Sequence, residues 1–160
     1  MQEIERKFLV KSNDYKTEAF DKVQIKQGFL NTHPQRTVRI RISGNKAFLT
    51  IKGKPEDGSI SRFEWEQEIP LSSANDMLSL CEPGQIEKVR YLVRSGKHVV
   101  EVDEFQGENQ GLVVAEIELE NEQETFVKPQ WLGQEVSGQT RYYNSQLSKN
   151  PFKQWDESSR

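Results

Sequence analysis

The sequence is poor in cysteine and lacks long apolar runs, and each shortage excludes a class of protein. Cys81 is the single cysteine among 160 residues, which excludes internal disulfides and cysteine-based metal sites and favours a reducing compartment. No apolar stretch resembles a signal core or a membrane span, so we expect a cytoplasmic protein with no membrane partner. Basic residues are dispersed and the net charge is −3, which argues against a nucleic-acid partner.

The chain also has few hydrophobic residues for a folded domain of its length. Hydrophobic residues make up 34% and charged residues 29%, a polar composition that still falls short of disorder. No linker rich in Gly, Ser or Pro interrupts it, so we expect one domain over residues 1–150 and a polar tail over 151–160, with Trp155 as an anchor. Something other than a plain apolar core must accommodate the charge.

Segments of alternating polarity, typical of β-strands, follow one another along the chain. Two tight turns, at Gly44 and Gly96, predict hairpins. The expected strands cover residues 1–10, 23–31, 38–42, 47–52, 62–69, 88–93, 99–105 and 113–120.

Only a few segments indicate helices. Ala74, Met77, Leu78 and Cys81 recur at helical spacing after a possible cap at Ser72 or Ser73. A short helical turn is expected within residues 12–20. Asn121 and Glu124 resemble a capping box, which predicts a short helix ended by Pro129. A further helix from about Thr140 places Tyr143 and Leu147 on one face.

Most of the expected strands carry charge on one face and apolar residues on the other. An antiparallel sheet with one solvated face gives the same alternation, but such a face accepts Thr, Ser and Gln, whereas here it holds mostly Glu, Arg and Lys. About eight strands suffice to close a barrel. The charged stripes are Glu3, Glu5, Lys7; Arg39, Arg41; Lys52; Arg62, Glu64, Glu66; Lys88, Arg90; Glu101, Asp103; and Glu116, Glu118.

A closed sheet with its charged face inward would enclose acids and bases together, with helices covering the apolar outer face. Buried charge at this density is tolerated only if it is paired, bound to metal or filled by a highly charged ligand.

The spacing Glu3-x-Glu5-x-Lys7 resembles the ExExK signature of the CYTH superfamily, also called triphosphate tunnel metalloenzymes. A short signature alone arises often by chance, but companion motifs follow it in family order over residues 3–147. They are Val38-Arg39-Ile40-Arg41, Leu49-Thr50-Ile51-Lys52, Arg62-x-Glu64-x-Glu66, Lys88-x-Arg90, Asp103-x-Phe105-x-Gly107, Ala115-Glu116-Ile117-Glu118, Glu135-Val136-Ser137 and Arg141-Tyr142-Tyr143-Asn144.

The resemblance implies an α+β fold, an eight-stranded antiparallel β-barrel with a few flanking helices, whose tunnel binds triphosphate-containing substrates with Mg²⁺ or Mn²⁺. The residue types agree with that role. Arg and Lys neutralise phosphate oxygens, Arg often through two hydrogen bonds; these cations need hard oxygen ligands. The expected phosphate-binding residues are Lys7, Arg39, Arg41, Lys52, Lys88 and Arg90. The expected metal ligands are Glu3, Glu5, Asp103, Glu116 and Glu118.

Phosphoryl transfer depends mainly on positioning and charge stabilisation, with a water oriented in line with the leaving phosphate. Glu64 or Glu66 is the hypothesis for the catalytic residue that orients this water. Three further residues have two interpretations each. Arg62 either lines the tunnel or pairs with Glu64 or a neighbouring strand, and Arg141 either reaches the tunnel or has an interstrand or capping role. Glu101 either extends its charged stripe or reaches solvent at the strand end.

Two positions depart from the family pattern. Many relatives carry Asp and Lys shortly before the Arg-Tyr pair, where this chain has Gln139 and Thr140, so one phosphate contact is missing. Phe29 stands where close relatives have Tyr, which removes a hydroxyl. Both changes leave the charged stripes intact.

The substrate is expected to be a small triphosphate. The members of the superfamily hydrolyse inorganic tripolyphosphate, thiamine triphosphate, nucleoside triphosphates or RNA ends, and others cyclise ATP. The short chain favours a metal-dependent hydrolase of inorganic tripolyphosphate that releases phosphate. The alternatives are adenylate cyclase, a thiamine or nucleoside triphosphatase, and, in another class, a noncatalytic module that binds polyphosphate or nucleotide.

Overall fold

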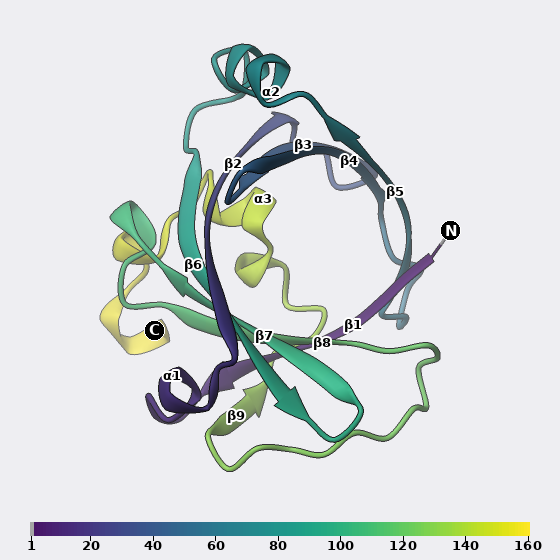
Figure 1. Cartoon of the computed structure of the whole chain (residues 1–160), viewed down its shortest axis with the longest axis vertical. Coiled ribbons are helices and arrows are strands. Elements are labelled where there is room, and N and C mark those ends of the chain that lie inside the picture. The colour runs from purple at the N-terminus through teal and green to yellow at the C-terminus, as the bar shows by residue number, and fades with distance from the viewer. Residues whose placement is uncertain (1) are drawn as a thin grey trace.

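The computed structural model describes residues 2–160 and is organised around one antiparallel sheet that closes into a ring (Figure 1). The order around the ring is β5-β4-β3-β2-β6-β7-β8-β1, and β1 pairs back with β5. The predicted eight-stranded antiparallel barrel is therefore confirmed. The strands are β1 Gln2–Val10, β2 Asp21–Asn31, β3 Arg36–Ser43, β4 Lys46–Gly53, β5 Ser61–Ile69, β6 Ile86–Ser95, β7 His98–Phe105, β8 Val113–Glu118 and β9 Leu132–Glu135.

Strand β1 closes the barrel by dividing its length between neighbours. Residues 5–9 pair with β8, whereas residues 2–4 pair with β5. The short strand β9, which the sequence did not predict, adds to the far end of β1 through Phe8 and Val10. Both predicted hairpins form, and Gly44 and Gly96 lie at their turns with φ of 60° and 61°, a left-handed conformation that favours glycine.

The alternation of β1 sends Glu3, Glu5 and Lys7 inward, whereas Arg6 lies on the outer face with Phe8 and pairs there with Glu135. Phe8 is buried outside the ring in a cluster with Tyr15 and Trp131. Tyr15 belongs to α1 Tyr15–Glu18. A second cluster joins Val114 of β8 to Leu147 and Trp155. Val114 shares its face of β8 with Glu116, which lines the interior, so this cluster lies on the inner face and closes one end of the barrel. Burial of these apolar side chains by short helices and loops is the main favourable term in the stability of the barrel.

Helix α2 (Leu71–Leu78) covers the outer side of β3 and β4, where Ala74 and Leu78 are buried against Ile40. Its spacing agrees with the prediction, but its start does not. The helix begins directly after Pro70, and no side chain caps it; the fixed φ of proline favours this kind of helix entry.

Two other helix predictions need correction. Residues 121–129 form no helix. Asn121 accepts the hydrogen bond from the Gln123 backbone that an N-cap accepts, but Glu124 contacts the Glu120 backbone and His98 instead of the Asn121 backbone. The helix expected from Thr140 is broken into a 3₁₀ turn at Thr140–Tyr142 and the short α3 (Asn144–Leu147).

The polar tail docks onto the barrel through Trp155, which the sequence predicted as an anchor. Its indole is buried against Tyr142 and Phe152 in edge-to-face contacts. Further 3₁₀ turns lie at Gly107–Asn109, Phe152–Gln154 and Glu157–Ser159. Within residues 2–160, no helix has the length and apolar character to cross a membrane.

Candidate functional site

A cavity of about 190 Å³ lies inside the barrel, and charged side chains from its strands line it. Every residue predicted for the site except Asp103 lies on the cavity wall. The lining residues are Glu3, Glu5, Lys7, Phe29, Thr37, Arg39, Arg41, Thr50, Lys52, Arg62, Glu64, Glu66, Lys88, Arg90, Glu101, Glu116, Glu118, Tyr143, Asn144 and Ser145.

Strand register explains why charges far apart in sequence meet. Lys7 pairs with Glu116 across β1 and β8, and Glu101 lies beside Glu116 across β7 and β8. Lys52 lies opposite Glu64 across β4 and β5. Because directly opposed residues in an antiparallel ladder point to the same face, each inward stripe places its charges beside those of its neighbours.

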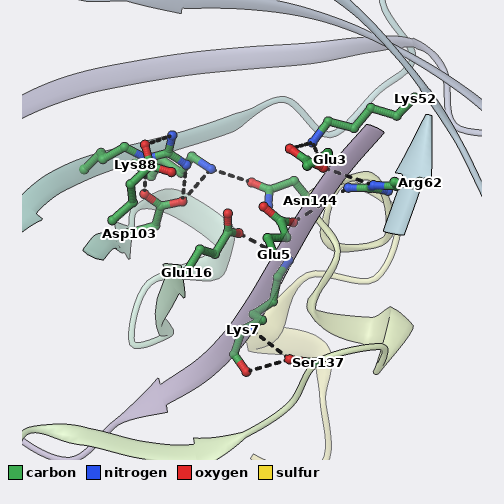
Figure 2. A network of polar contacts seen from close by, with 12 residues as sticks. Glu3, Glu5, Lys7, Lys52, Arg62, Lys88, Asp103, Glu116, Ser137 and Asn144 are labelled. Carbon is green, nitrogen blue, oxygen red and sulfur yellow. Dashed lines mark hydrogen bonds and ion pairs between the residues drawn. The ribbon is translucent and has the colours of Figure 1, made fainter. Parts of the chain in front are cut away.

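One end of the cavity contains an ion cluster around Glu3 (Figure 2). Its carboxylate accepts hydrogen bonds from Lys52 Nζ at 3.0 Å and Arg62 Nε at 3.2 Å. Burial opposes ionisation, but these two cations lower the pKa of Glu3 to about 2. Arg62 therefore both faces the cavity and forms an ion pair, so its two predicted interpretations hold together.

The other end is organised by Asp103, which is only 1% exposed. It receives two hydrogen bonds from Arg90, at 2.8 and 2.9 Å, and lies 2.8 Å from Lys88 Nζ. Burial would raise the pKa of Asp103, yet the two cations lower it to about 2. The predicted role of Asp103 as a metal ligand does not fit this position, since both of its oxygens already hold cations behind the cavity wall.

Glu5 and Glu116 lie together on the cavity wall, with Lys7 beside them (Figure 2). Burial, with repulsion from Glu116 and Glu3, raises the pKa of Glu5 to about 8. Burial also opposes ionisation of Glu116, but Lys7 at 3.3 Å and Arg90 hold its pKa well below its usual range. Ionisation of the Glu5 carboxylate is therefore unfavourable unless a further cation binds beside the pair.

This acidic pair fits a divalent cation of the Mg²⁺ type. Within residues 2–160, no three His, Cys, Asp or Glu side chains are grouped as a complete metal centre. Mg²⁺ is commonly held by one or two carboxylates, with substrate phosphates and water completing its shell. Glu118 also faces the cavity, and burial and repulsion from Glu3 and Glu101 raise its pKa, which again indicates excess negative charge on this wall.

Glu64 and Glu66, the predicted catalytic residues, both line the cavity but in different surroundings. Burial and a hydrogen bond with Glu3 raise the pKa of Glu64 to about 7. Glu66 accepts a hydrogen bond of 2.7 Å from Thr50 Oγ and lies 3.4 Å from Arg39. A group whose pKa lies near neutrality is suited to exchange protons, which Glu64 satisfies.

Arg39 has an unused donor. Its Nη2 donates to Thr50 at 3.2 Å and to Glu66 at 3.4 Å. Its Nε is buried and has no hydrogen-bond partner among the described residues. Since buried donors are almost always paired, this nitrogen indicates a site for an acceptor inside the cavity.

Several polar residues of the site belong to motifs shared with the family, but the sequence assigned them no role. Asn144 on α3 accepts a hydrogen bond of 2.9 Å from Lys88 Nζ (Figure 2). The Tyr143 ring lies 5.2 Å from Lys7 Nζ and 5.4 Å from the Arg62 guanidinium carbon. Ser137 accepts a hydrogen bond from the Lys7 backbone. Their positions depend on the course of the chain after β9.

Two residues with open interpretations are now placed. Glu101 lines the cavity and lies 3.1 Å from Arg90 Nη1. Arg141 lies outside the site, where its guanidinium carbon is 4.3 Å from the Trp155 ring centroid and its Nη2 donates to the Ser159 carbonyl. It anchors the tail instead of reaching the tunnel.

Comparison with known proteins gives one consistent group. The family model described as "CYTH domain" matches residues 1–151. An inorganic triphosphatase of Acetivibrio thermocellus is 47% identical over 156 residues, covering 97% of this chain and 98% of that protein. One of Nitrosomonas europaea is 34% identical over 155 residues, covering 92% and 97%. The crystal structure of the inorganic triphosphatase NE1496 has a TM-score of 0.62 at 30% identity, covering 91% of this chain and 96% of that one.

Proposed function

Because this chain belongs to the CYTH domain family, we propose that it is an enzyme that hydrolyses inorganic triphosphate with a divalent cation. Relatives matched over nearly their whole length are inorganic triphosphatases. The observation that carries the proposal is the unpaired, buried Nε of Arg39 within a cavity lined by basic side chains. An anionic oxygen supplies the acceptor that this donor lacks.

The phosphate chain is bound by the basic side chains of the cavity. Most of these are already fixed by carboxylates or amides, so little side-chain entropy is lost when the substrate binds. The assigned phosphate-binding residues are Lys7, Arg39, Arg41, Lys52, Lys88 and Arg90.

Glu5, Glu116 and Glu118 are assigned to hold Mg²⁺ or Mn²⁺, with Glu3 nearby but bound to Lys52 and Arg62. When bound, such a cation neutralises charge on the phosphates and promotes ionisation of water. The high pKa of Glu5 supports this assignment, because a cation that displaces its proton relieves the repulsion from Glu116.

Hydrolysis adds water to a terminal phosphorus while the bond to its bridging oxygen breaks, giving phosphate and pyrophosphate. Glu64 is assigned to accept the proton of the attacking water, because its pKa near neutrality matches a general base. Glu66, held by Thr50, orients the water or a phosphate-binding arginine. The basic side chains stabilise negative charge that develops on the leaving pyrophosphate.

The size of the cavity favours an inorganic substrate. At about 190 Å³ it is smaller than the roughly 300–1,000 Å³ of typical small-molecule sites. A larger cavity of about 570 Å³ adjoins it and shares four lining residues with it, Thr37, Arg62, Tyr143 and Ser145. Substrates with an organic group therefore belong in the experimental test.

The test is to incubate the protein with Mg²⁺ or Mn²⁺ and inorganic tripolyphosphate, thiamine triphosphate or ATP, and to measure phosphate and cyclic AMP. We expect rapid phosphate release from tripolyphosphate and none without the cation. Cyclic AMP from ATP would favour a cyclase, and binding without either product would favour a noncatalytic module.

A further inference from the structure

Arg41 differs from every other basic residue of the cavity. Within residues 2–160 it makes no ion pair, and its Nε donates a hydrogen bond of 2.8 Å to the side-chain oxygen of Gln27. The other cations are paired with carboxylates. These pairs are Lys7–Glu116, Arg39–Glu66, Lys52–Glu3, Arg62–Glu3, Lys88–Asp103 and Arg90–Asp103.

Gln27 connects Arg41 to Asn144 and, through it, to Lys88. It is 0% exposed on β2, directly beside Arg41 of β3. Its side-chain nitrogen donates a hydrogen bond of 3.0 Å to the side-chain oxygen of Asn144. The same oxygen accepts a hydrogen bond of 2.9 Å from Lys88 Nζ. The two amides, Gln27 and Asn144, therefore form a continuous link between two cations, which we name the amide relay.

The relay fixes Arg41 without neutralising it. Burial and repulsion from Arg39 and Arg90 lower the pKa of Arg41 to about 9, as expected where positive charge is concentrated. A carboxylate at position 27 would stabilise the guanidinium but would compete with an anion for it. An amide holds only Nε and leaves the two terminal nitrogens of Arg41 for phosphate oxygens.

We propose that Gln27 and Asn144 are positioning residues for the triphosphate: the amide relay orients Arg41 and Lys88 toward the phosphate chain while Arg41 keeps its full charge for the substrate. This inference rests on the proposed function. Under this inference, two neutral residues contribute to the specificity for anions. They contact the cationic side chains and do not contact the reacting atoms.

The test compares Gln27→Glu with Gln27→Met. The Glu variant keeps the shape and the oxygen that accepts from Arg41, but adds a negative charge; the Met variant keeps approximate volume and loses both hydrogen bonds. Steady-state kinetics with Mg²⁺ and inorganic tripolyphosphate give KM and kcat, and thermal melting reports folding. We expect Gln27→Glu to raise KM at least about 10-fold, more than Gln27→Met, with a smaller change in kcat.

A merely structural role for Gln27 gives the reverse order. Gln27→Glu would then be the milder variant, since it retains the bond to Arg41. A KM of Gln27→Glu equal to that of the wild type would also overturn the inference. The difference between the two variants should also shrink in an Arg41→Met background, where no guanidinium remains to be neutralised.

Asn144→Asp provides a second route if Gln27→Glu fails to fold. It places the charge at the other end of the relay, beside Lys88, and is expected to raise KM in the same way; an unchanged KM contradicts the relay. Wild-type protein is the control for the premise: if it releases no phosphate from tripolyphosphate, the proposed function fails and the inference falls with it, whereas an active wild type with insensitive variants overturns the relay alone.

Discussion

The two sides of the barrel interior hold their charges in opposite ways. The basic wall consists of Arg39, Arg41, Lys52, Lys88 and Arg90, from β3, β4 and β6. The acidic wall consists of Glu3, Glu5, Glu101, Glu116 and Glu118, from β1, β7 and β8. The basic wall is fixed by carboxylates and amides, whereas on the acidic wall like charges crowd together and raise the pKa of Glu5 to about 8. Under the proposed function, the basic side chains are already held in place when the anion binds, and a cation bound at the acidic wall relieves the repulsion between its carboxylates.

The largest effect on activity is expected from the acidic wall. Glu116→Gln removes a ligand assigned to the cation, and phosphate release should fall roughly 100-fold or more. Initial rates with Mn²⁺ check this, with Glu68→Gln as the matched control, because Glu68 is exposed on β5 outside the cavity. Full turnover by Glu116→Gln would remove the metal assignment.

The basic wall should give the next largest effect. Arg39→Lys keeps a positive charge but loses the planar donor group that includes the unpaired Nε, so KM for tripolyphosphate should rise about 10-fold. The exposed Arg36 at the start of β3 offers a control, and Arg36→Lys should leave KM unchanged. Equal behaviour of the two variants would show that only net charge matters.

The crowding of the acidic wall should also appear as a pH dependence of stability. The pKa of Glu5 is raised from 4.5 to about 8, so the metal-free fold binds a proton that the unfolded chain releases. This contribution to stability is complete below about pH 4.5 and is lost as the pH rises through about 8, at up to about 1.4 kcal/mol per pH unit.

Denaturant unfolding of the metal-free protein at several pH values between about 5 and 8 measures this slope. The wild type should lose stability relative to Glu5→Gln, which keeps a neutral group at all these pH values. Parallel curves for the two proteins would show that Glu5 is ionised in the metal-free fold.

The smallest effect on activity is expected from the outer face of the barrel. Leu78→Ala removes a buried side chain of α2 that packs on β3 and β4 and should cost about 2–4 kcal/mol of unfolding free energy. Because α2 contributes no residue to the cavity, KM measured well below the melting temperature should stay within about two-fold of the wild type. A larger rise would show that the outer packing also sets the geometry of the walls.

The barrel could be predicted because the alternation of charged and apolar residues is a local property of each strand. Glu5 and Glu116 were placed correctly on the cavity wall in this way. Asp103 obeyed the same alternation, but whether its oxygens face the cavity or two neighbouring cations depends on the register of β6 against β7, which pairs it with Arg90.

Residues outside the regular strands were less predictable. Arg141 was a candidate and lies in the tail cluster, whereas Asn144, three positions later, reaches Lys88. The path of the chain after β9 decides between them, and no local pattern encodes it. The failed helix at residues 121–129 has the same origin, since Glu124 binds His98 from a hairpin distant in sequence.

The central claim is that a cation on the acidic wall and a phosphate chain on the basic wall meet inside this barrel. A crystal structure with Mn²⁺ and a nonhydrolysable tripolyphosphate analogue, with anomalous diffraction from manganese, tests it most directly. The account predicts a manganese peak within coordination distance, about 2.0–2.3 Å, of Glu5 and Glu116, with phosphate oxygens at Arg39 and Arg41. Manganese bound outside the cavity, or an analogue bound away from the basic wall, would contradict it.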